Sequence, residues 1–200
     1  MAKERLKSPR ARLFVALDLP DPVRAAIVEW GDEALADPAL RPVAPESLHV
    51  TLAFLGYLPE REIEPLAAIV REVGGPAPKV TLGDPVQRPE RGRPRLFALP
   101  AESPGTISLQ AALEEKLVAA HLYKPEKRPF WPHVTVARVR REERGSKRPA
   151  PVSWPPRELP QGLLQPFVGV RIVLYRSQLQ PQGAQYTPLA QVELPAGGRQ

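Results

Sequence analysis

The feature of this sequence that most constrains its fold is a short internal repeat. LHVTLAFLG at residues 48–56 is matched by PHVTVARVR at residues 132–140, and both copies contain His-Val-Thr followed by an aliphatic residue. Because β-branched and aliphatic residues dominate both copies, each is predicted to be a β-strand. The order of predicted elements around each copy also recurs roughly. The repeat therefore predicts a fold of two similar halves, each with one strand of this kind.

The polar residues of the two copies are predicted to meet in one cleft. Because strand side chains alternate, His49 projects from the same face as Thr51. His133 and Thr135 share a face of their strand in the same way. If the two strands lie side by side in pseudo-symmetric halves, two imidazoles and two hydroxyls converge on a single cleft, which suits a phosphate group.

Such a set of side chains can open a cyclic phosphodiester. Hydrolysis needs a water deprotonated on one side of the phosphorus atom and the leaving ribose oxygen protonated on the other. Two histidines can do both without a metal, because an ordinary pKa of about 6.5 lets one imidazole be neutral while the other is cationic. Threonine hydroxyls can donate hydrogen bonds to the non-bridging oxygens. A bell-shaped dependence of rate on pH is expected.

Charge and composition narrow the class of partner. The net charge of +6 favours polyanions, nucleic acid first, although a basic surface can also serve solubility alone. The absence of cysteine excludes disulfides, thiolate metal sites and a cysteine nucleophile, and it fits a reducing cytoplasm. The apolar run at 13–17 is too short for a signal peptide, and no run reaches the roughly eighteen apolar residues of a membrane span. We expect a cytoplasmic protein without a membrane partner.

The rest of the chain predicts an α+β fold. Strands are predicted at residues 12–17, 48–56, 79–88, 95–99, 132–139, 168–176 and 185–194. Helices are predicted at residues 22–35, 60–73 and 106–122. The strands at 79–88 and 95–99 read as a hairpin around a basic turn. We expect a single domain over residues 1–200, with a flexible N-terminus at 1–10 and a long surface loop at 141–162, where charge and proline mix without periodicity.

The sequence resembles the 2H phosphoesterase superfamily and, within it, the RNA 2′,3′-cyclic phosphodiesterases also called 2′-5′ RNA ligases. The resemblance covers nearly the whole chain and is carried by RLFVALDLP, VAPESLHVTLAFLGYLPE, PRLFALP, KRPFWPHVTVARVR, LYRSQL and GAQYTPLA. It implies a bilobal, pseudo-two-fold α+β fold, with two antiparallel sheets flanked by helices around a central cleft. It also implies hydrolysis of RNA 2′,3′-cyclic phosphate ends to 2′-phosphates without metal or cofactor, with the 3′ oxygen leaving and weak reversal as 2′-5′ ligation.

The resemblance also assigns roles to individual residues. It implies that His49 is the proton donor and His133 the proton acceptor, while Thr51 and Thr135 hold the phosphate. Arg138, five places after the second histidine, matches a basic phosphate-binding residue of the family. Strict alternation turns Arg138 away from His133, so it needs a strand end or a bulge to reach the phosphate. The alternative for Arg138 is a solvated surface charge.

Aromatic and basic residues near the repeat are secondary candidates. The residues that could stack on a base, or instead belong to the core, are Phe54, Tyr57, Phe130 and Trp131. The basic hairpin turn at 88–95 and the segment 124–148 could contact RNA phosphates or be solvated loops. His121, outside the repeat, is expected to be a capping or surface residue.

The expected partner is RNA with a 2′,3′-cyclic phosphate end, tRNA fragments among the candidates, bound by a monomer. Three alternatives stay open. One is a nucleotide- or RNA-binding module on the same fold without turnover, although a pure binder does not need a matched acid and base. Another is a 2H phosphodiesterase acting on a small cyclic nucleotide or a cyclic ADP-ribose phosphate. The third is a metal site at the histidine pair, which the absence of Cys, Asp and Glu within the repeats disfavours.

Overall fold

The structure is a computed structural model that describes residues 9–180 and 183–195. It has the predicted α+β fold, with ten strands in the described part of the chain. The strands are β1 (Arg10–Asp18), β2 (Leu40–Pro42), β3 (His49–Pro59), β4 (Lys79–Leu82), β5 (Val86–Arg88), β6 (Leu96–Glu102), β7 (His133–Val139), β8 (Phe167–Val168), β9 (Arg171–Gln180) and β10 (Gly183–Glu193). The helices are α1 (Asp21–Ala34), α2 (Ile63–Glu72) and α3 (Pro104–Ala119), with 3₁₀ turns η1 (Pro45–Ser47) and η2 (Glu60–Glu62).

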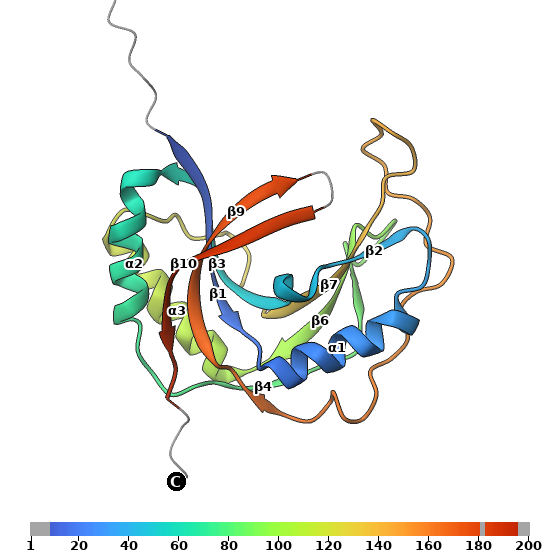
Figure 1. Ribbon diagram of the computed structural model, residues 1–200, viewed down its shortest axis with the longest axis horizontal. Helices are drawn as coiled ribbons and strands as arrows, with labels where there is room; N and C mark the ends of the chain where they lie inside the picture. Colours follow the sequence, from blue (N-terminus) through green and yellow to red (C-terminus); the bar gives the residue numbers. More distant parts are fainter. Residues whose placement is uncertain (1–8, 181–182, 196–200) are drawn as a thin grey trace, which may run out of the picture.

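The strands form one antiparallel sheet whose two halves meet at the strands of the internal repeat (Figure 1). The order is β10-β9-β1-β3-β7-β6-β4-β8, with β2 paired to β7 and β5 paired to β6. Among the described residues, β3 and β7 share a single pair, Val50 with Val134, so the halves diverge beyond this point. The two antiparallel sheets expected from the sequence are thus two halves of one sheet, each ending at its histidine strand.

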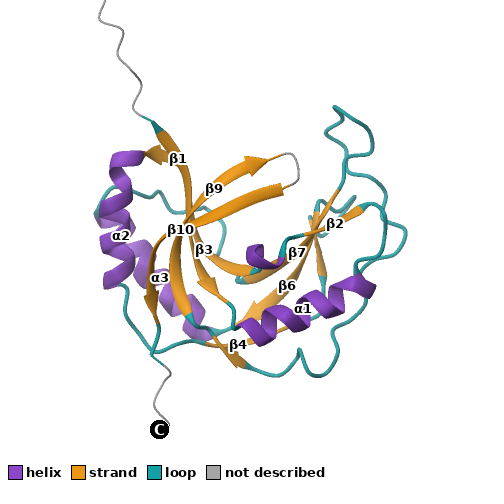
Figure 2. Cartoon of the chain, viewed as in Figure 1, coloured by secondary structure: helices purple, strands orange, loops and turns teal. Residues whose placement is uncertain are grey.

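The helices cover the sheet and tie its halves together. α2 packs on β9 and β10 of the first half, and α3 packs on α2 and β3 although it follows β6 of the second half. α1 follows β1 but lies along the second half (Figure 2), where Ile27 lines the same small cavity as Val136 of β7. Each half is therefore partly covered by a helix that follows a strand of the other half, and the two share one hydrophobic core.

The ends of α3 follow local signals in the sequence. The helix begins two residues earlier than predicted because the hydroxyl of Ser103 accepts the backbone N–H of Thr106 at 3.0 Å, which caps the first turn. At the other end, His121 has a φ of 58°, and the N–H of Leu122 donates to the carbonyl of Leu117 at 3.0 Å. This is the left-handed ending that closes many helices. His121 is exposed and terminates the helix, as expected of a residue outside the repeat.

Three strands differ from their predictions. The predicted strand 79–88 is divided into β4 and β5 by the segment 83–85, which contains Gly and Pro. Both parts still pair with β6, so the predicted hairpin is present. The predicted strand 168–176 is divided into β8 and β9 in the same way. β2 is absent from the sequence-based prediction because three residues ending in proline carry no periodic signal.

The long connection at 141–162 is held down at one point. Between residues 139 and 167 the described chain has no helix or strand, apart from one isolated bridge. The buried carboxylate of Asp37 accepts the backbone N–H groups of Ser153 and Trp154, both at 2.8 Å. Burial acts to raise the pKa of Asp37, but these N–H groups and that of Ala39 outweigh it and leave the pKa lowered. The loop is therefore anchored to the body of the protein by an ionised side chain.

Of the predicted flexible N-terminus at 1–10, residues 1–8 lie outside the described residues, and Arg10 already begins β1. None of the helices in residues 9–180 and 183–195 is long and apolar enough to cross a membrane. β1 itself is buried along most of its length, and β3 and β9 pair with its two edges in the sheet.

Candidate active site

The polar side chains of the internal repeat line one cleft, where the two halves of the sheet diverge. The cleft has a volume of about 590 Å³. His49 and Thr51 reach it from β3, and His133 and Thr135 reach it from β7. Charge on His133 is near enough to lower the pKa of His49. The structure thus brings the four side chains together at a single site.

A β-bulge in β7 turns Arg138 toward this cleft. Thr135 and Ala137 pair with consecutive residues of β6, which leaves Val136 as the extra residue of β7. Because the alternation of side chains shifts by one at the bulge, Arg138 projects from the same face as Thr135 and lines the cleft. A bulge is one of the two routes by which the sequence allowed Arg138 to approach the phosphate site.

β3 has the same bulge at the same position of the repeat. Thr51 and Ala53 pair with consecutive residues of β1, which leaves Leu52 as the extra residue. Phe54 is thereby turned to the cleft, which it lines with 43% of its surface exposed. The two copies of the repeat therefore share a backbone irregularity as well as a sequence, and Phe54 occupies in one copy the place that Arg138 occupies in the other.

The ring of His133 is held by a hydrogen bond and by stacking. Its Nδ1 lies 2.8 Å from the backbone carbonyl of Trp131, which can only accept, so Nδ1 carries a proton. The Trp131 ring stacks on the imidazole with centroids 4.2 Å apart, and the guanidinium of Arg88 lies 3.8 Å from the Trp131 centroid. Burial lowers the pKa of His133, with Arg88 and Arg138 acting in the same direction and the Trp131 carbonyl opposing them.

His49 lies in a cluster of aromatic rings. Its ring centroid is 5.0 Å from that of Phe14, 5.5 Å from that of Tyr186 and 6.2 Å from that of Tyr175. Its Nδ1 is buried and has no hydrogen-bond partner among the described residues. Burial, together with the positive charges of Arg24 and His133, lowers the pKa of His49 to about 4. In the free protein at neutral pH, His49 is therefore uncharged.

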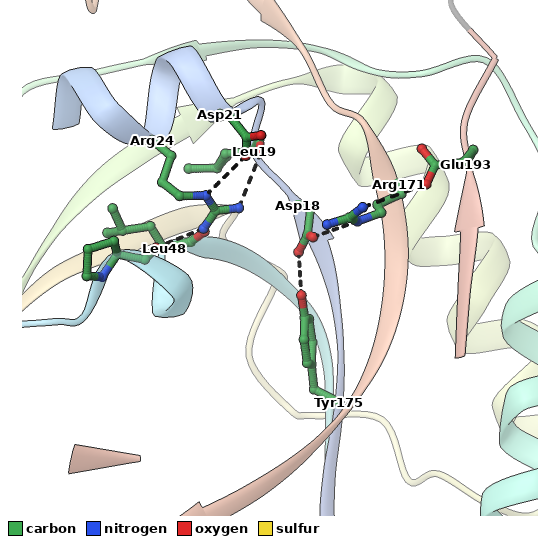
Figure 3. A network of polar contacts seen from close by, with 9 residues as sticks. Asp18, Leu19, Asp21, Arg24, Leu48, Arg171, Tyr175 and Glu193 are labelled. Atoms are coloured by element: carbon green, nitrogen blue, oxygen red, sulfur yellow. Dashed lines mark hydrogen bonds and ion pairs between the residues drawn. The ribbon is translucent and has the colours of Figure 1, made fainter. Parts of the chain in front are cut away.

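A buried carboxylate holds one ring of this cluster, that of Tyr175 (Figure 3). Asp18 is 3% exposed and lies opposite His49 in the pairing of β1 with β3. It accepts hydrogen bonds from Arg171 Nε and from the Tyr175 hydroxyl, both at 2.9 Å. The Tyr175 ring in turn stacks on Phe14 at 5.2 Å. Asp18 thus fixes the position of Tyr175, one of the three rings that pack around His49.

Arg24 of α1 positions the chain just before His49. Its guanidinium donates to the carbonyls of Pro45 and Leu48, both at 2.8 Å, and also to the carbonyl of Leu19 at 3.3 Å (Figure 3). These bonds connect η1 to the helix that follows β1. Arg24 therefore links α1 to η1 and to the residue before β3, which fixes the start of β3 and the position of His49.

The threonines and Arg138 are available to a ligand. Thr51 and Thr135 are half-buried, and neither hydroxyl has a hydrogen bond to another residue of the described chain. Arg138 is exposed and has no ion pair within the described residues. The cleft also contains residues that the sequence analysis did not single out, namely Arg12, Phe14, Arg41, Ser177 and Tyr186.

Of the four aromatic residues proposed to stack on a base, only Phe54 lines the cleft. Tyr57 is 57% exposed, beyond the bulge of β3. Phe130 is partly buried against the core. Trp131 does not line the cleft; its ring stacks on His133 and lies under the Arg88 guanidinium, so it supports the imidazole.

The basic hairpin turn at 88–95 lies outside the cleft, and of the segment 124–148 only His133, Thr135 and Arg138 line it. In the hairpin turn, Arg88 pairs with Glu90, and Arg93 donates to Glu142 at 3.0 Å. Acidic neighbours therefore neutralise part of this surface. In the described residues, no group of three or more His, Cys, Asp or Glu side chains is placed to hold a metal ion.

Some of the supporting residues have signals in the sequence that point to a role without defining it. Asp18 is a charged residue directly after the apolar run LFVAL, and burial there is unusual unless the charge has a partner. Tyr175 and Tyr186 lie in LYRSQL and GAQYTPLA, two segments that carry the family resemblance without an assigned role. Their contact with His49 depends on β9 pairing with β1 and β10 pairing with β9, which no local pattern predicts.

Comparison with known proteins places the chain in a family. A profile of the 2′-5′ RNA ligase superfamily matches residues 19–160. The chain is 36% identical to the RNA 2′,3′-cyclic phosphodiesterase of Thermus thermophilus, over 92% of this chain and 90% of that protein. It is 31% identical to the protein of the same name from Escherichia coli, over 89% and 93% of the two chains.

Solved structures share the fold along nearly its whole length. The crystal structure of TT0787 of T. thermophilus has a TM-score of 0.76 at 32% identity, covering 93% of this chain and 99% of that one. E. coli LigT complexed with 3′-AMP has a TM-score of 0.70 at 28% identity, covering 93% and 99%. Both strands of the internal repeat fall inside the matched range, and the chain belongs to the 2′-5′ RNA ligase superfamily.

Proposed function

We propose that this protein hydrolyses the 2′,3′-cyclic phosphate end of RNA to a 2′-phosphate, without a metal, by acid–base catalysis between two histidines. One observation carries the proposal: both histidines and both threonines of the repeat line a single cleft. The relatives named RNA 2′,3′-cyclic phosphodiesterase support the choice of substrate.

His133 is suited to be the base. Because its Nδ1 donates to the Trp131 carbonyl, the neutral ring keeps its lone pair on Nε2. Its lowered pKa keeps the ring neutral at pH 7. In the proposed step, Nε2 takes a proton from water as the water oxygen forms a bond to phosphorus.

His49 is then the acid that protonates the leaving 3′ oxygen as the P–O3′ bond breaks. Its pKa of about 4 in the free protein means that it must gain a proton on binding substrate. An anionic phosphate next to the ring favours the imidazolium, so the substrate itself raises the pKa of the group that acts on it. The product carries a 2′-phosphate and a 3′-hydroxyl. The proton removed from water ends on His133, and the proton on the 3′ oxygen comes from His49.

Three further residues hold the phosphoryl group. The hydroxyls of Thr51 and Thr135 donate to its non-bridging oxygens, and Arg138, aimed by the bulge, neutralises the charge that grows in the transition state. If a ribose 5′-hydroxyl attacks in place of water, the same groups give a 2′-5′ linkage. Ligation is thus the weak partner reaction of the same site.

The test is turnover of an RNA oligonucleotide with a 2′,3′-cyclic phosphate in the presence of EDTA. His49→Ala and His133→Ala should each lower kcat by about 10²- to 10⁴-fold. His121→Asn is the matched control, because it removes the third histidine and tolerates the left-handed backbone there. Binding without turnover in the wild type would favour a non-catalytic module. Loss of activity in EDTA would favour a metal enzyme. Turnover of small cyclic nucleotides alone would favour a 2H phosphodiesterase of that narrower substrate class.

Turnover of tRNA fragments, a monomeric state and a cytoplasmic location remain predictions from the sequence. A pool of cellular RNA treated with the protein, sedimentation of the purified chain and fractionation of cells test them in turn.

A further inference from the structure

β2 brings a second arginine to the cleft, directly beside Arg138. β2 pairs antiparallel with β7, and in this pairing Arg41 lies opposite Arg138. Residues opposite each other in neighbouring strands project from the same face, with Cβ atoms about 5 Å apart. Both side chains line the cleft.

This pair of like charges has no counter-ion in the described part of the chain. Neither Arg41 nor Arg138 has an ion pair or a side-chain hydrogen bond there. Other arginines of the fold do have partners, such as Arg93 with Glu142 and Arg171 with Asp18. Two cations placed opposite each other destabilise a sheet, and an anion between or above them relieves the repulsion.

The two arginines lie at different depths relative to the histidines. Arg138 lies on β7, the strand of His133, and its charge adds to the burial that lowers the pKa of His133, whereas Arg41 lies on the neighbouring strand β2. β2 also lies on the same side of β7 as β3, past the point where β3 leaves β7 at Val134. The order outward from the catalytic centre is therefore His133, Arg138 and Arg41.

We propose that Arg41 binds the phosphate on the 5′ side of the terminal nucleotide, while Arg138 binds the cyclic phosphate. This inference rests on the proposed function. In an RNA with a cyclic end, the next anion along the strand is separated from the cyclic phosphate by one ribose, and it lies on the 5′ side alone. Arginines on two adjacent strands can therefore each meet one phosphate. Arg41 makes the site prefer RNA ends to free nucleoside cyclic phosphates.

The test compares three substrates: adenosine 2′,3′-cyclic phosphate, its 5′-phosphorylated form and an ApA dinucleotide with the cyclic end. Arg41→Gln should lower kcat/KM about tenfold or more on the second and third, mainly through KM, and leave the first unchanged within about twofold. Arg41→Lys should recover part of the loss, because a lysine still offers a point charge. Arg144→Gln, which removes the same charge from an exposed loop position, should change none of them.

Equal losses on all three substrates, no loss on any, or a loss confined to the dinucleotide each overturn the proposal. The last would indicate a contact with the second nucleoside and not with the phosphate. A binding measurement separates this inference from the proposed function. Wild-type protein should bind adenosine 2′,5′-bisphosphate more tightly than 2′-AMP, and Arg41→Gln should abolish that preference even if no substrate is turned over. An unchanged preference in Arg41→Gln overturns the proposal.

Discussion

Phe54 and Arg138 occupy equivalent positions in the two copies of the repeat, each turned into the cleft by a one-residue bulge after the threonine. The bulges break the alternation that would point both side chains away. One copy therefore offers an aromatic ring and the other a cation to the same ligand. The two copies of the repeat therefore present different side chains to the two sides of the cleft.

We predict different kinetic effects for these two residues. Arg138→Gln should lower kcat about 10- to 100-fold, because its charge stabilises the transition state. Phe54→Ala should raise KM about tenfold with little change in kcat, because a ring that stacks a base contributes about 1–3 kcal/mol to binding. Steady-state kinetics on a cyclic-ended dinucleotide separate the two. A loss of kcat in Phe54→Ala, equal to that in Arg138→Gln, would contradict this division.

The pH dependence of kcat/KM should lie on the acid side of neutrality. His49, with a pKa of about 4, must be protonated, while His133, with a lowered pKa, must be neutral. Above about pH 6.5 the fraction of free protein with His49 protonated and His133 neutral should fall roughly tenfold per pH unit, and kcat/KM should fall with it. In the complex the phosphate raises the pKa of His49, so the alkaline limb of kcat should lie at higher pH. A kcat/KM that stays constant between pH 6.5 and 8 would be incompatible with this account.

Buried His49 should also make the fold sensitive to acid. The unfolded chain takes up a proton near the ordinary histidine pKa of 6.5, whereas the folded chain does so only near 4. Stability from this group is therefore complete above pH 6.5 and is lost as the pH falls toward 4. The free energy of unfolding should be about 2 kcal/mol lower at pH 5 than at pH 7.

Urea unfolding at the two pH values measures this loss. His49→Gln should reduce the pH dependence by about 2 kcal/mol and leave the part that comes from His133, whose pKa is also lowered. His121→Asn, at an exposed position, is the control and should leave the pH dependence unchanged. The pKa of Asp37 is lowered, so the stability that Asp37 provides is lost only as the pH falls below its ordinary pKa of 3.8. Asp37 therefore does not affect the comparison of pH 5 with pH 7. An unchanged pH dependence in His49→Gln would show that other groups are responsible.

Tyr175 should act as a positioning residue for His49. Tyr175→Phe keeps the ring against Phe14 but removes the hydrogen bond to buried Asp18, at a cost of about 1–3 kcal/mol. We expect kcat to fall several-fold and the alkaline limb of kcat to shift, because the environment of His49 changes. Tyr57→Phe is the control, since Tyr57 is exposed and lies outside the cleft. A variant with lower stability but an unchanged pH profile would make Tyr175 merely structural.

Much of the site could be predicted because its information is local. His49 with Thr51, and His133 with Thr135, follow from the alternation of side chains within single strands. Predicting the position of Arg138 also requires the bulge at Val136. The alternation within β7 indicates that an irregularity is needed, but it does not indicate where the irregularity lies.

The rest depends on contacts between distant segments. Arg41 enters the cleft through β2, a strand of three residues that pairs with β7, which lies far along the chain. Tyr175 and Tyr186 reach His49 because β9 pairs with β1 and β10 pairs with β9. The Trp131 carbonyl accepts from His133 and its ring packs on the imidazole, although these two residues were candidates for different roles in the sequence. None of these contacts has a periodic signature.

The most direct test of the central claim replaces the 3′ bridging oxygen of the cyclic phosphate by sulfur. A thiolate leaves without protonation, so the variant that lacks the acid should recover while the variant that lacks the base should not. We predict that His49→Ala hydrolyses the sulfur substrate within about tenfold of the wild-type rate, and that His133→Ala remains about 10²-fold or more slower. Recovery of His133→Ala, or of neither variant, would contradict the assignment of the two histidines as acid and base on one phosphorus atom.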